Sequence, residues 1–417
     1  MFNSSFLRRG IGVCFFPIAL FPPIARAQES LDVERYVEIV RRSHPAGRQA
    51  KAHEAAALAE RRGAGLFSDP IIEYSHSRAS IEGLRATERG FAVTQVLPWP
   101  GWRSAEVRVS EKAGDGWRAA GQALLWDVEV EARHAFSRLV ESYALVEIER
   151  SAEADARSLR DVVGRRVDLG ESRESDRLRA NVQWMRQQTA LDAAEREATS
   201  AERIVRALAV APLPESLILR SEAWTPPLLT ESLTLKARLD RNPGLRSAQA
   251  DAQREEALLS LALARRRPEL ELSLFRGQEF DKTSTGLSFG LRVPLWNANR
   301  GEIARAEAAA AVSNAIVART RVEMETMLDA LGKDLDVAGR QARTLYNDIL
   351  PAATASLKLV RFSYEEGETS LLDLLDAQRT WRDTQREAIQ ARLSLARAVA
   401  EIQRLVGPDF NPWSVKR

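Results

Sequence analysis

Residues 268–295 read PELELSLFRGQEFDKTSTGLSFGLRVPL, and apolar side chains alternate with polar ones in two runs of this stretch. Leu270, Leu272 and Leu274 alternate with Glu271 and Ser273, while Leu287, Phe289, Leu291 and Val293 alternate with Ser288, Gly290 and Arg292. A period of two with one apolar face is typical of a half-buried strand. The stretch therefore predicts a hairpin with strands of about 7–10 residues and a polar connection near 276–286.

The first half of the chain contains a similar pair of segments. Phe91 and Val93 alternate with Ala92 and Thr94, Ile72 and Tyr74 flank Glu73, and a polar connection lies near 78–88. Strands of this length come close to the roughly 9–11 residues that a tilted transmembrane strand needs. The alternative is a small sheet packed on helices and surrounded by water.

The two hairpins belong to a repeat with a spacing of about 197 residues. Six features recur in order: His44-Pro45 as Asn242-Pro243, Pro70 as Pro268, Pro98 near Pro294, Asp168-Leu169-Gly170 as Glu365-Glu366-Gly367, Asp176 as Asp373, and Trp184 as Trp381. Chance produces one or two such matches, and an ordered series indicates a duplicated chain.

Each half has the same plan: a helical opening, a hairpin, a long helical run, a glycine turn and a second helical run. The expected boundaries are a first half at 28–210 (hairpin about 70–97, tip about 164–176), a proline-rich linker at 211–230, a second half at 231–407 (hairpin about 268–295, tip about 361–373), and a tail at 408–417. No proline interrupts 101–211, so a run such as 103–165 reaches roughly 95 Å if helical. Helices of that length favour a coiled coil or a tube.

The last helical run carries a heptad pattern. Leu374, Trp381, Ala388, Leu395 and Ile402 recur at steps of seven, and Ala377, Thr384, Ala391, Ala398 and Leu405 follow three places after each. A weaker version in the first half is Trp184, Leu191, Ala198 and Val205. Apolar residues at such positions form the contact seam of a coiled coil. The seam alone is equally consistent with an ordinary antiparallel helical bundle.

Four strands cannot close a barrel wide enough to hold a channel, whereas three chains supply twelve. The predicted fold class is therefore mainly α with a small membrane β part. The two helix–hairpin–long-helix halves would build a trimeric twelve-stranded β-barrel continued by an α-helical barrel.

The N-terminus has the pattern of a secretory signal peptide over 1–27. Arg8 and Arg9 precede an apolar run, and Ala25-Arg26-Ala27 is a small-x-small cleavage site. The alternative is a frayed N-terminal helix.

Because the full chain has a net charge of +2 and the signal carries three arginines, the mature chain has a net charge of −1. That balance gives no case for nucleic-acid binding. Removal of Cys14 with the signal also excludes disulfides and thiolate sites.

Nothing in the sequence predicts an enzyme, a cofactor or a resident metal ion. The four histidines, His44, His53, His76 and His134, have no second histidine or cysteine at metal-ligand spacing. The sequence also contains no nucleophile elbow and no phosphate-binding loop.

The repeated plan and one motif resemble the TolC-type outer-membrane factors over nearly the whole mature chain. The motif is YEEGETSLLDLLDAQR at 364–379. Two further segments, QVLPWPGWR at 95–103 and VPLWNANRG at 293–301, look most like the branch that serves cobalt, zinc and cadmium efflux pumps.

The resemblance implies a homotrimer in outer-membrane lipid, with an α-helical tube that crosses the periplasm. Gly170 and Gly367 would form the tip turns, where a periplasmic adaptor and an inner-membrane resistance-nodulation-division pump dock. Asp176, Tyr364, Asp373 and Asp376 match the positions of the periplasmic gate. At a place where the family often has arginine, two residues after the second tip glycine, this chain has Thr369, so one link of a closed gate is missing or replaced.

Asp373 and Asp376 are three residues apart, so they share one face of a helix. Around a threefold axis they would form two rings of carboxylates, an arrangement that selects cations in a narrow mouth. Without the resemblance, the favoured interpretation is a pair of surface acids near a helix N-terminus, where they stabilise the helix dipole.

The expected function is a passive exit duct for substrates, with heavy-metal cations as the expected cargo. A drug or protein export channel of the same fold is one alternative, and a periplasmic coiled-coil adaptor is another. An adaptor carries one helical hairpin without duplication, so the repeat favours the duct. The sequence alone leaves the cargo, the pump, the adaptor and the resting state of the gate open.

Overall fold

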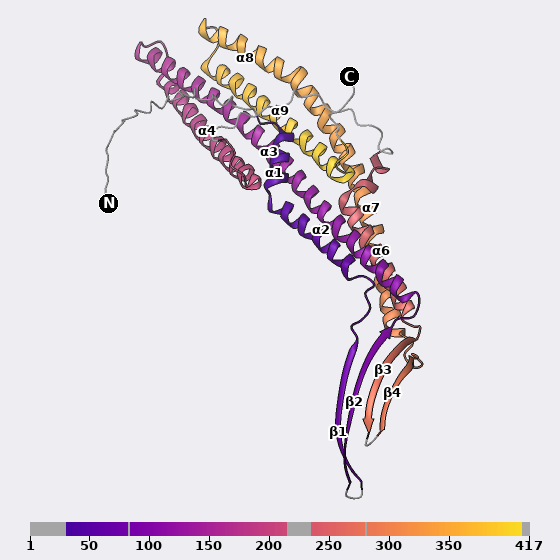
Figure 1. Cartoon of the computed structure of the whole chain (residues 1–417). Coiled ribbons are helices and arrows are strands. Elements are labelled where there is room, and N and C mark those ends of the chain that lie inside the picture. The colour runs from indigo at the N-terminus through magenta and orange to yellow at the C-terminus, as the bar shows by residue number, and fades with distance from the viewer. Residues whose placement is uncertain (1–30, 82–83, 215–234, 280–281, 411–417) are drawn as a thin grey trace, which may run out of the picture.

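The computed structural model describes residues 31–81, 84–214, 235–279 and 282–410. The predicted signal peptide, most of the predicted linker and residues 411–417 of the tail lie outside the described residues. The described chain is elongated, with a sheet at one end and the turns of two helical hairpins at the other (Figure 1). None of the described helices has both the length and the hydropathy needed to cross a membrane.

Both halves follow one order of elements. The first half contains α1 (Val33–Ser43), α2 (Pro45–Gly63), β1 (Ile71–Ile81), β2 (Leu84–Leu97), α3 (Trp102–Asp168) and α4 (Glu174–Ala209). The second contains η1 (Leu239–Arg241), α6 (Pro243–Ala264), β3 (Glu269–Glu279), β4 (Lys282–Arg292), α7 (Arg300–Thr344), the π-helix η2 (Leu345–Ile349), α8 (Leu350–Glu365) and α9 (Leu371–Val406).

The duplication is clear in the lengths of the elements. Helices α4 and α9 have 36 residues each, and their first residues, Glu174 and Leu371, lie 197 positions apart. The caps correspond as well: the His44 Nδ1 atom accepts a hydrogen bond at the start of α2, and the Asn242 side chain does the same for α6. In both helices proline occupies the first turn, where its missing N–H is not needed.

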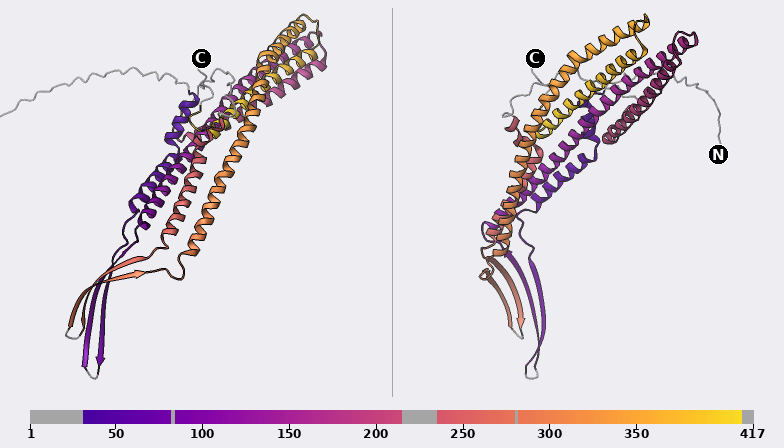
Figure 2. Two further views of the ribbon diagram at one scale, coloured as in Figure 1. Left: turned by 90° about the vertical axis from the view of Figure 1, so that its right-hand side faces the viewer. Right: turned by 180° about the vertical axis from the view of Figure 1, so that it is seen from behind.

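The long helices differ between the halves. Helix α3 is unbroken over 67 residues, whereas its counterpart is divided into α7, η2 and α8, of 45, 5 and 16 residues. Pro351 lies at the start of α8. Because proline has no N–H and its ring collides with the carbonyl one turn earlier, it disrupts an α-helix, and a π-turn accommodates the disruption. The second rod is therefore continuous but curved (Figure 2).

The four strands form one antiparallel sheet in the order β1-β2-β3-β4. Strands β2 and β3 join the two halves, with Val93 opposite Leu274. The strands have 11 to 14 residues, so the expectation of about 7–10 was too short. The segments expected as polar connections, near 78–88 and 276–286, are strand for most of their length, because the backbone pairing of each hairpin continues into them.

Apolar clusters hold each half together. One cluster joins α1, α3 and α4 around Tyr36 and Leu139, and another joins α7 and α9 around Leu328 and Leu395. The heptad pattern of α9 is confirmed, because its members are buried except for the half-buried Trp381 and Ala377. A third cluster joins the two hairpins near their turns.

Candidate functional site

The sheet has one apolar face, which follows from its register. Directly opposite residues of antiparallel strands point to the same side, so Ile72, Tyr74, Phe91, Val93, Leu97, Leu270, Leu272, Leu274, Leu287, Phe289 and Leu291 share one face. Many of these side chains are exposed, and Phe289 reaches 70%. A continuous exposed apolar surface of this extent marks a contact with another apolar phase or another chain.

The other face of the sheet is mainly polar and acidic, although Ile71, Val96 and Phe275 also lie on it. It carries Glu73, Glu88, Glu269, Glu271 and Glu279, with Lys282 and Arg292 as the cations. The Arg292 guanidinium contacts Glu269 at 3.3 Å and Glu271 at 2.8 Å. Carboxylates outnumber cations on this face, so it attracts cations.

At the far end of the molecule, the two hairpin turns have the same geometry. Gly170 has φ 77° and Gly367 has φ 80°, as the sequence predicted. Each turn closes with two backbone hydrogen bonds. In the first turn, Glu171 N donates to Arg166 O and Gly170 N donates to Val167 O. In the second turn, Glu368 N donates to Ser363 O and Gly367 N donates to Tyr364 O. This is the Schellman motif, in which the residue with positive φ is usually glycine. The role of both turns in docking stays a prediction.

Tyr364 and Asp176 lie near each other at this end. Burial raises the pKa of the Tyr364 hydroxyl, Arg166 opposes the shift and Asp176 adds to it. Within the described chain no hydrogen bond joins Tyr364 to Asp176. The Arg166 guanidinium instead lies 5.2 Å from the centroid of the Tyr364 ring. The Asp176 carboxylate forms an ion pair with Arg179 at 3.5 Å. The proposed Tyr364–Asp176 link stays a prediction.

The two other gate candidates lie in the first turns of α9. Asp373 forms a capping box with Ser370, and the hydrogen bonds from the Ser370 hydroxyl and backbone hold the pKa of its carboxyl below the usual value. Asp376 is exposed one turn later. The nearby Thr369 Oγ1 is buried and, within the described residues, has no hydrogen-bond partner. Asp373 is thus an exposed acid at the N-terminus of a helix, as the alternative interpretation expected, and a ring of carboxylates stays a prediction.

A charged, open groove of about 470 Å³ lies between α3 and α4 beside the first turn. Its lining includes Arg160, Arg165, Asp168 and Arg177, and Arg177 contacts Asp168 at 2.7 Å. The lining of this groove is thus mainly charged.

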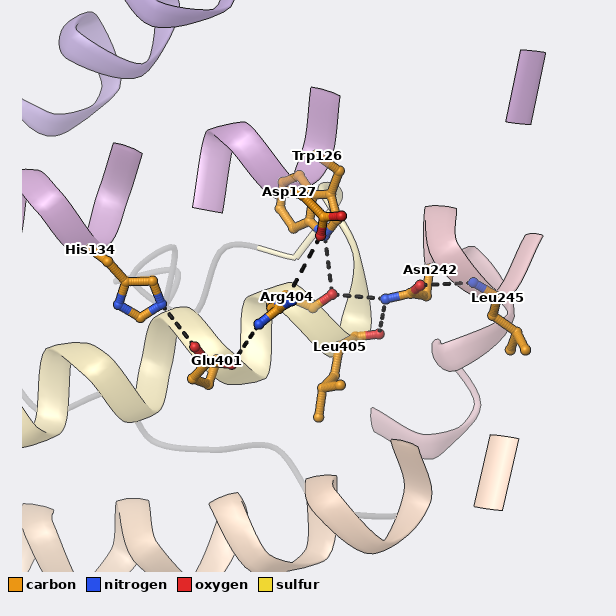
Figure 3. Close-up of polar contacts among 8 residues, drawn as sticks. All are labelled: Trp126, Asp127, His134, Asn242, Leu245, Glu401, Arg404 and Leu405. Carbon is orange, nitrogen blue, oxygen red and sulfur yellow. Dashed lines mark hydrogen bonds and ion pairs between the residues drawn. The ribbon is translucent and has the colours of Figure 1, made fainter. Parts of the chain in front are cut away.

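A seam of charged residues joins the two halves along α3 and α9. At the inner end of this α3–α9 seam, His134 Nε2 lies 2.9 Å from Glu401 Oε1, and Arg404 lies between Glu401 and Asp127 at 3.8 and 3.9 Å (Figure 3). Beside these pairs, the Trp126 indole and the Asn242 amide donate to the Arg404 carbonyl. The end of α9 is thereby fixed to both α3 and α6.

Closer to the turns, the α3–α9 seam contains a buried ion pair. The Glu149 side chain is only 2% exposed, and its Oε1 lies 2.6 Å from Arg386 Nη2. Burial lowers the pKa of the neighbouring Arg382, helped by repulsion from Arg386. With its amide oxygen toward Arg382, Gln183 of α4 accepts from the guanidinium at 3.0 Å. Three helices are thus joined through polar groups shielded from water.

Between these two ends, Glu141 of α3 faces Arg397 and Arg392 of α9. Burial raises the pKa of its carboxyl to about 8, although both guanidinium groups oppose the shift. Sequence reasoning missed the α3–α9 seam. Its only signal was the spacing of seven between Asp127, His134 and Glu141, which places them on one helix face.

Across the part of the chain that the structure describes, no group of three or more histidine, cysteine or carboxylate side chains could hold a metal ion. The site is an arrangement of surfaces: a two-faced sheet, two glycine turns and a polar seam.

Comparison with known proteins agrees with this arrangement. Residues 234–408 match the family described as Outer membrane efflux protein. The chain is 23% identical over 321 residues to the cobalt-zinc-cadmium resistance protein CzcC of Cupriavidus metallidurans. This alignment covers 76% of this chain and 77% of CzcC.

Two solved structures share the fold. A membrane protein from Pseudomonas aeruginosa has a TM-score of 0.76 at 17% identity, with 90% of each chain covered. The outer membrane protein VceC from Vibrio cholerae has a TM-score of 0.74 at 16% identity, covering 90% of this chain and 96% of that one. The second half of the chain therefore has the sequence pattern of the outer membrane efflux proteins, and nearly the whole chain has the fold of these two solved membrane proteins.

Proposed function

We propose that the chain is one subunit of a trimeric outer-membrane efflux channel, a passive exit duct driven by an inner-membrane pump through a periplasmic adaptor. One observation carries the proposal: a sheet with one apolar and one acidic face stands at the end of two long helical hairpins. The family relationship supports the same function.

The sheet has the dimensions of a membrane segment. Strands of 11 to 14 residues extend about 36–46 Å at 3.3 Å per residue, enough to cross a 30 Å hydrocarbon core when tilted. The edge strands β1 and β4 have no neighbour on their outer sides within the described chain. Unpaired backbone groups are too costly in lipid. Pairing β4 of one chain with β1 of the next closes twelve strands around a threefold axis, with the acidic face inside.

The helices have the length of a tube. The 67 residues of α3 extend about 100 Å at 1.5 Å per residue. Three copies supply six hairpins, whose turns form the periplasmic end. There Gly170 and Gly367 form the docking turns, Tyr364 and Asp176 restrict the opening, and Asp373 and Asp376 face the narrow mouth.

Heavy-metal cations are the proposed cargo. The relative CzcC is named for cobalt, zinc and cadmium resistance, and the acidic face of the sheet favours cations. A wide duct needs no resident metal site, because hydrated ions pass through it. A drug or protein export channel of the same fold is the alternative.

Fractionation and metal tolerance test the proposal together. The chain should occur in the outer-membrane fraction as a heat-sensitive, detergent-resistant trimer. A deletion strain should become sensitive to cobalt, zinc and cadmium while its tolerance to bulky antibiotics stays unchanged. A periplasmic monomer would contradict the channel. A trimer whose loss sensitises cells only to antibiotics would contradict the metal cargo alone.

A further inference from the structure

Three of the four connections between the sheet and the helices, those next to β1, β2 and β4, carry large exposed apolar side chains. Because both hairpins are antiparallel, β1 and β3 begin, and β2 and β4 end, at the helical end of the sheet (Figure 2). The exposed side chains of these connections are Leu66, Phe67, Trp99, Leu295 and Trp296, and Trp296 is 91% exposed. Tryptophan with this exposure beside an apolar sheet face is typical of a membrane–water interface.

Six exposed arginines lie on the four connections or within three residues of them in the sequence. They are Arg61, Arg62, Arg103, Arg266, Arg267 and Arg300, here named the arginine collar. Among the contacts of the described residues, none of the six has a carboxylate partner, whereas their neighbours Arg265 and Arg292 pair with Glu106, Glu269 and Glu271. Within the described residues, the arginine collar therefore presents guanidinium groups that form no direct ion pair with a carboxylate.

Two contacts hold the arginine collar in place. The Arg103 guanidinium lies 4.8 Å from the ring centroid of Phe67, and Arg267 Nη1 donates to the Pro100 carbonyl at 3.0 Å. Each contact fixes the guanidinium and leaves most of its five N–H donors available. The donors of these two arginines therefore lie beside the connections at the helical end of the sheet.

We propose that the arginine collar binds the phosphate groups of anionic phospholipids in the membrane leaflet nearest the helices. The inference rests on the proposed location in a membrane. When the apolar face lies in hydrocarbon, Trp99 and Trp296 lie at the headgroup level, and the arginines lie beside the phosphates. Arginine suits this position because its planar guanidinium binds phosphate through two hydrogen bonds and is weakly hydrated.

The test measures lipid binding to the intact trimer. The purified full-length chain is titrated with phosphatidylglycerol or phosphatidylcholine in detergent, and bound lipids are counted by native mass spectrometry. The collar variant is Arg103→Gln/Arg266→Gln/Arg267→Gln. The matched control, Arg319→Gln/Arg340→Gln/Arg379→Gln, removes three equally charged helix-surface arginines whose side chains are 60–76% exposed. Inorganic phosphate serves as the competitor.

The collar variant should bind phosphatidylglycerol about a hundredfold more weakly, since each arginine near an anionic surface contributes a factor of about five. The control variant and phosphatidylcholine binding should be unchanged. Equal losses in both variants, complete displacement by inorganic phosphate, or loss of the trimer in the collar variant alone would overturn the proposal. Failure of the wild-type chain to insert into lipid bilayers would instead contradict the proposed function.

Discussion

Glu149 on α3 and Arg386 on α9 are separated by 237 residues, yet their side chains form an ion pair of 2.6 Å inside the seam between the two halves. The long helices α3 and α9 of different halves are joined by several charged pairs as well as by apolar contacts near the turns. Charged pairs depend strongly on geometry, so the seam fixes one relative position of the two hairpins.

Breaking the buried pair should destabilise the chain. Arg386→Met leaves the Glu149 carboxylate buried without its partner, and the expected cost is about 3–5 kcal/mol. Adding Glu149→Gln to Arg386→Met should recover most of the lost stability, because the buried charge is then removed. The measurement is the thermal midpoint in detergent. Arg340→Met, which breaks an exposed pair with Asp336, is the control and should cost less than about 1 kcal/mol. Equal effects of Arg386→Met and Arg340→Met would show that the buried pair has no special role.

Glu141 should make stability depend on pH. Burial raises its folded-state pKa to about 8, above the value of about 4.3 in an unfolded chain. The stabilising contribution of protonated Glu141 to the free energy of unfolding is therefore full below the unfolded pKa, declines as pH rises, and is lost above about pH 8. Glu141→Gln should raise the thermal midpoint near pH 9 and change it little near pH 4. Glu147→Gln, whose side chain is 72% exposed on the same helix, should show no such dependence. A pH-independent effect of Glu141→Gln would contradict the shift.

Charge on the apolar face of the sheet should impair membrane assembly. Leu272→Arg or Phe289→Arg should cost about 2–4 kcal/mol each near the middle of the membrane. Ser273→Arg, and Ser288→Arg directly opposite it, place the same charge on the acidic face and should be tolerated. The amount of heat-sensitive trimer in the outer-membrane fraction is the readout. Similar trimer levels in all four variants would mean that the strands do not span the bilayer.

A β-branched residue at the second turn should uncouple export from assembly. Gly367 has φ 80° and open space where a Cβ would lie, so Gly367→Val strains the backbone without a side-chain collision. Trimer levels should stay near normal while metal export is lost. Gly332→Val, at an equally open helical glycine without positive φ, should retain export. Wild-type export by Gly367→Val would exclude this turn from the docking surface.

The two pairs of gate residues should have different effects on conductance. Tyr364→Phe with Asp176→Ala removes a hydroxyl and a carboxylate between the hairpins, so resting conductance in planar bilayers should rise. Asp373→Asn with Asp376→Asn should instead reduce cation preference and weaken block by divalent cations. Wild-type conductance and block in both double variants would contradict both assignments.

The sequence predicted the parts of the fold that depend on local pattern. Alternation at 270–274 and 287–293 placed the second hairpin, and the heptads of α9 identified its buried face. Strand lengths were underestimated, because the polar ends of the hairpins lack an apolar face and yet keep the register through backbone pairing.

The α3–α9 seam could not be predicted, for a physical reason. An ion pair such as Glu149–Arg386 depends on how two halves pack, and many arginines on α9 have equally suitable spacing. The capping box of Ser370 and Asp373 is local, because both residues lie in the first turn of α9. The Tyr364–Asp176 link, in contrast, depends on how the two turns approach each other.

The unbroken α3 and the interrupted rod formed by α7, η2 and α8 differ mechanically although they occupy corresponding places in the two halves. An uninterrupted hydrogen-bond ladder resists bending, and a proline with a π-turn provides a compliant joint. Duplication thus gives each chain two rods of unequal stiffness, which two identical copies could not provide.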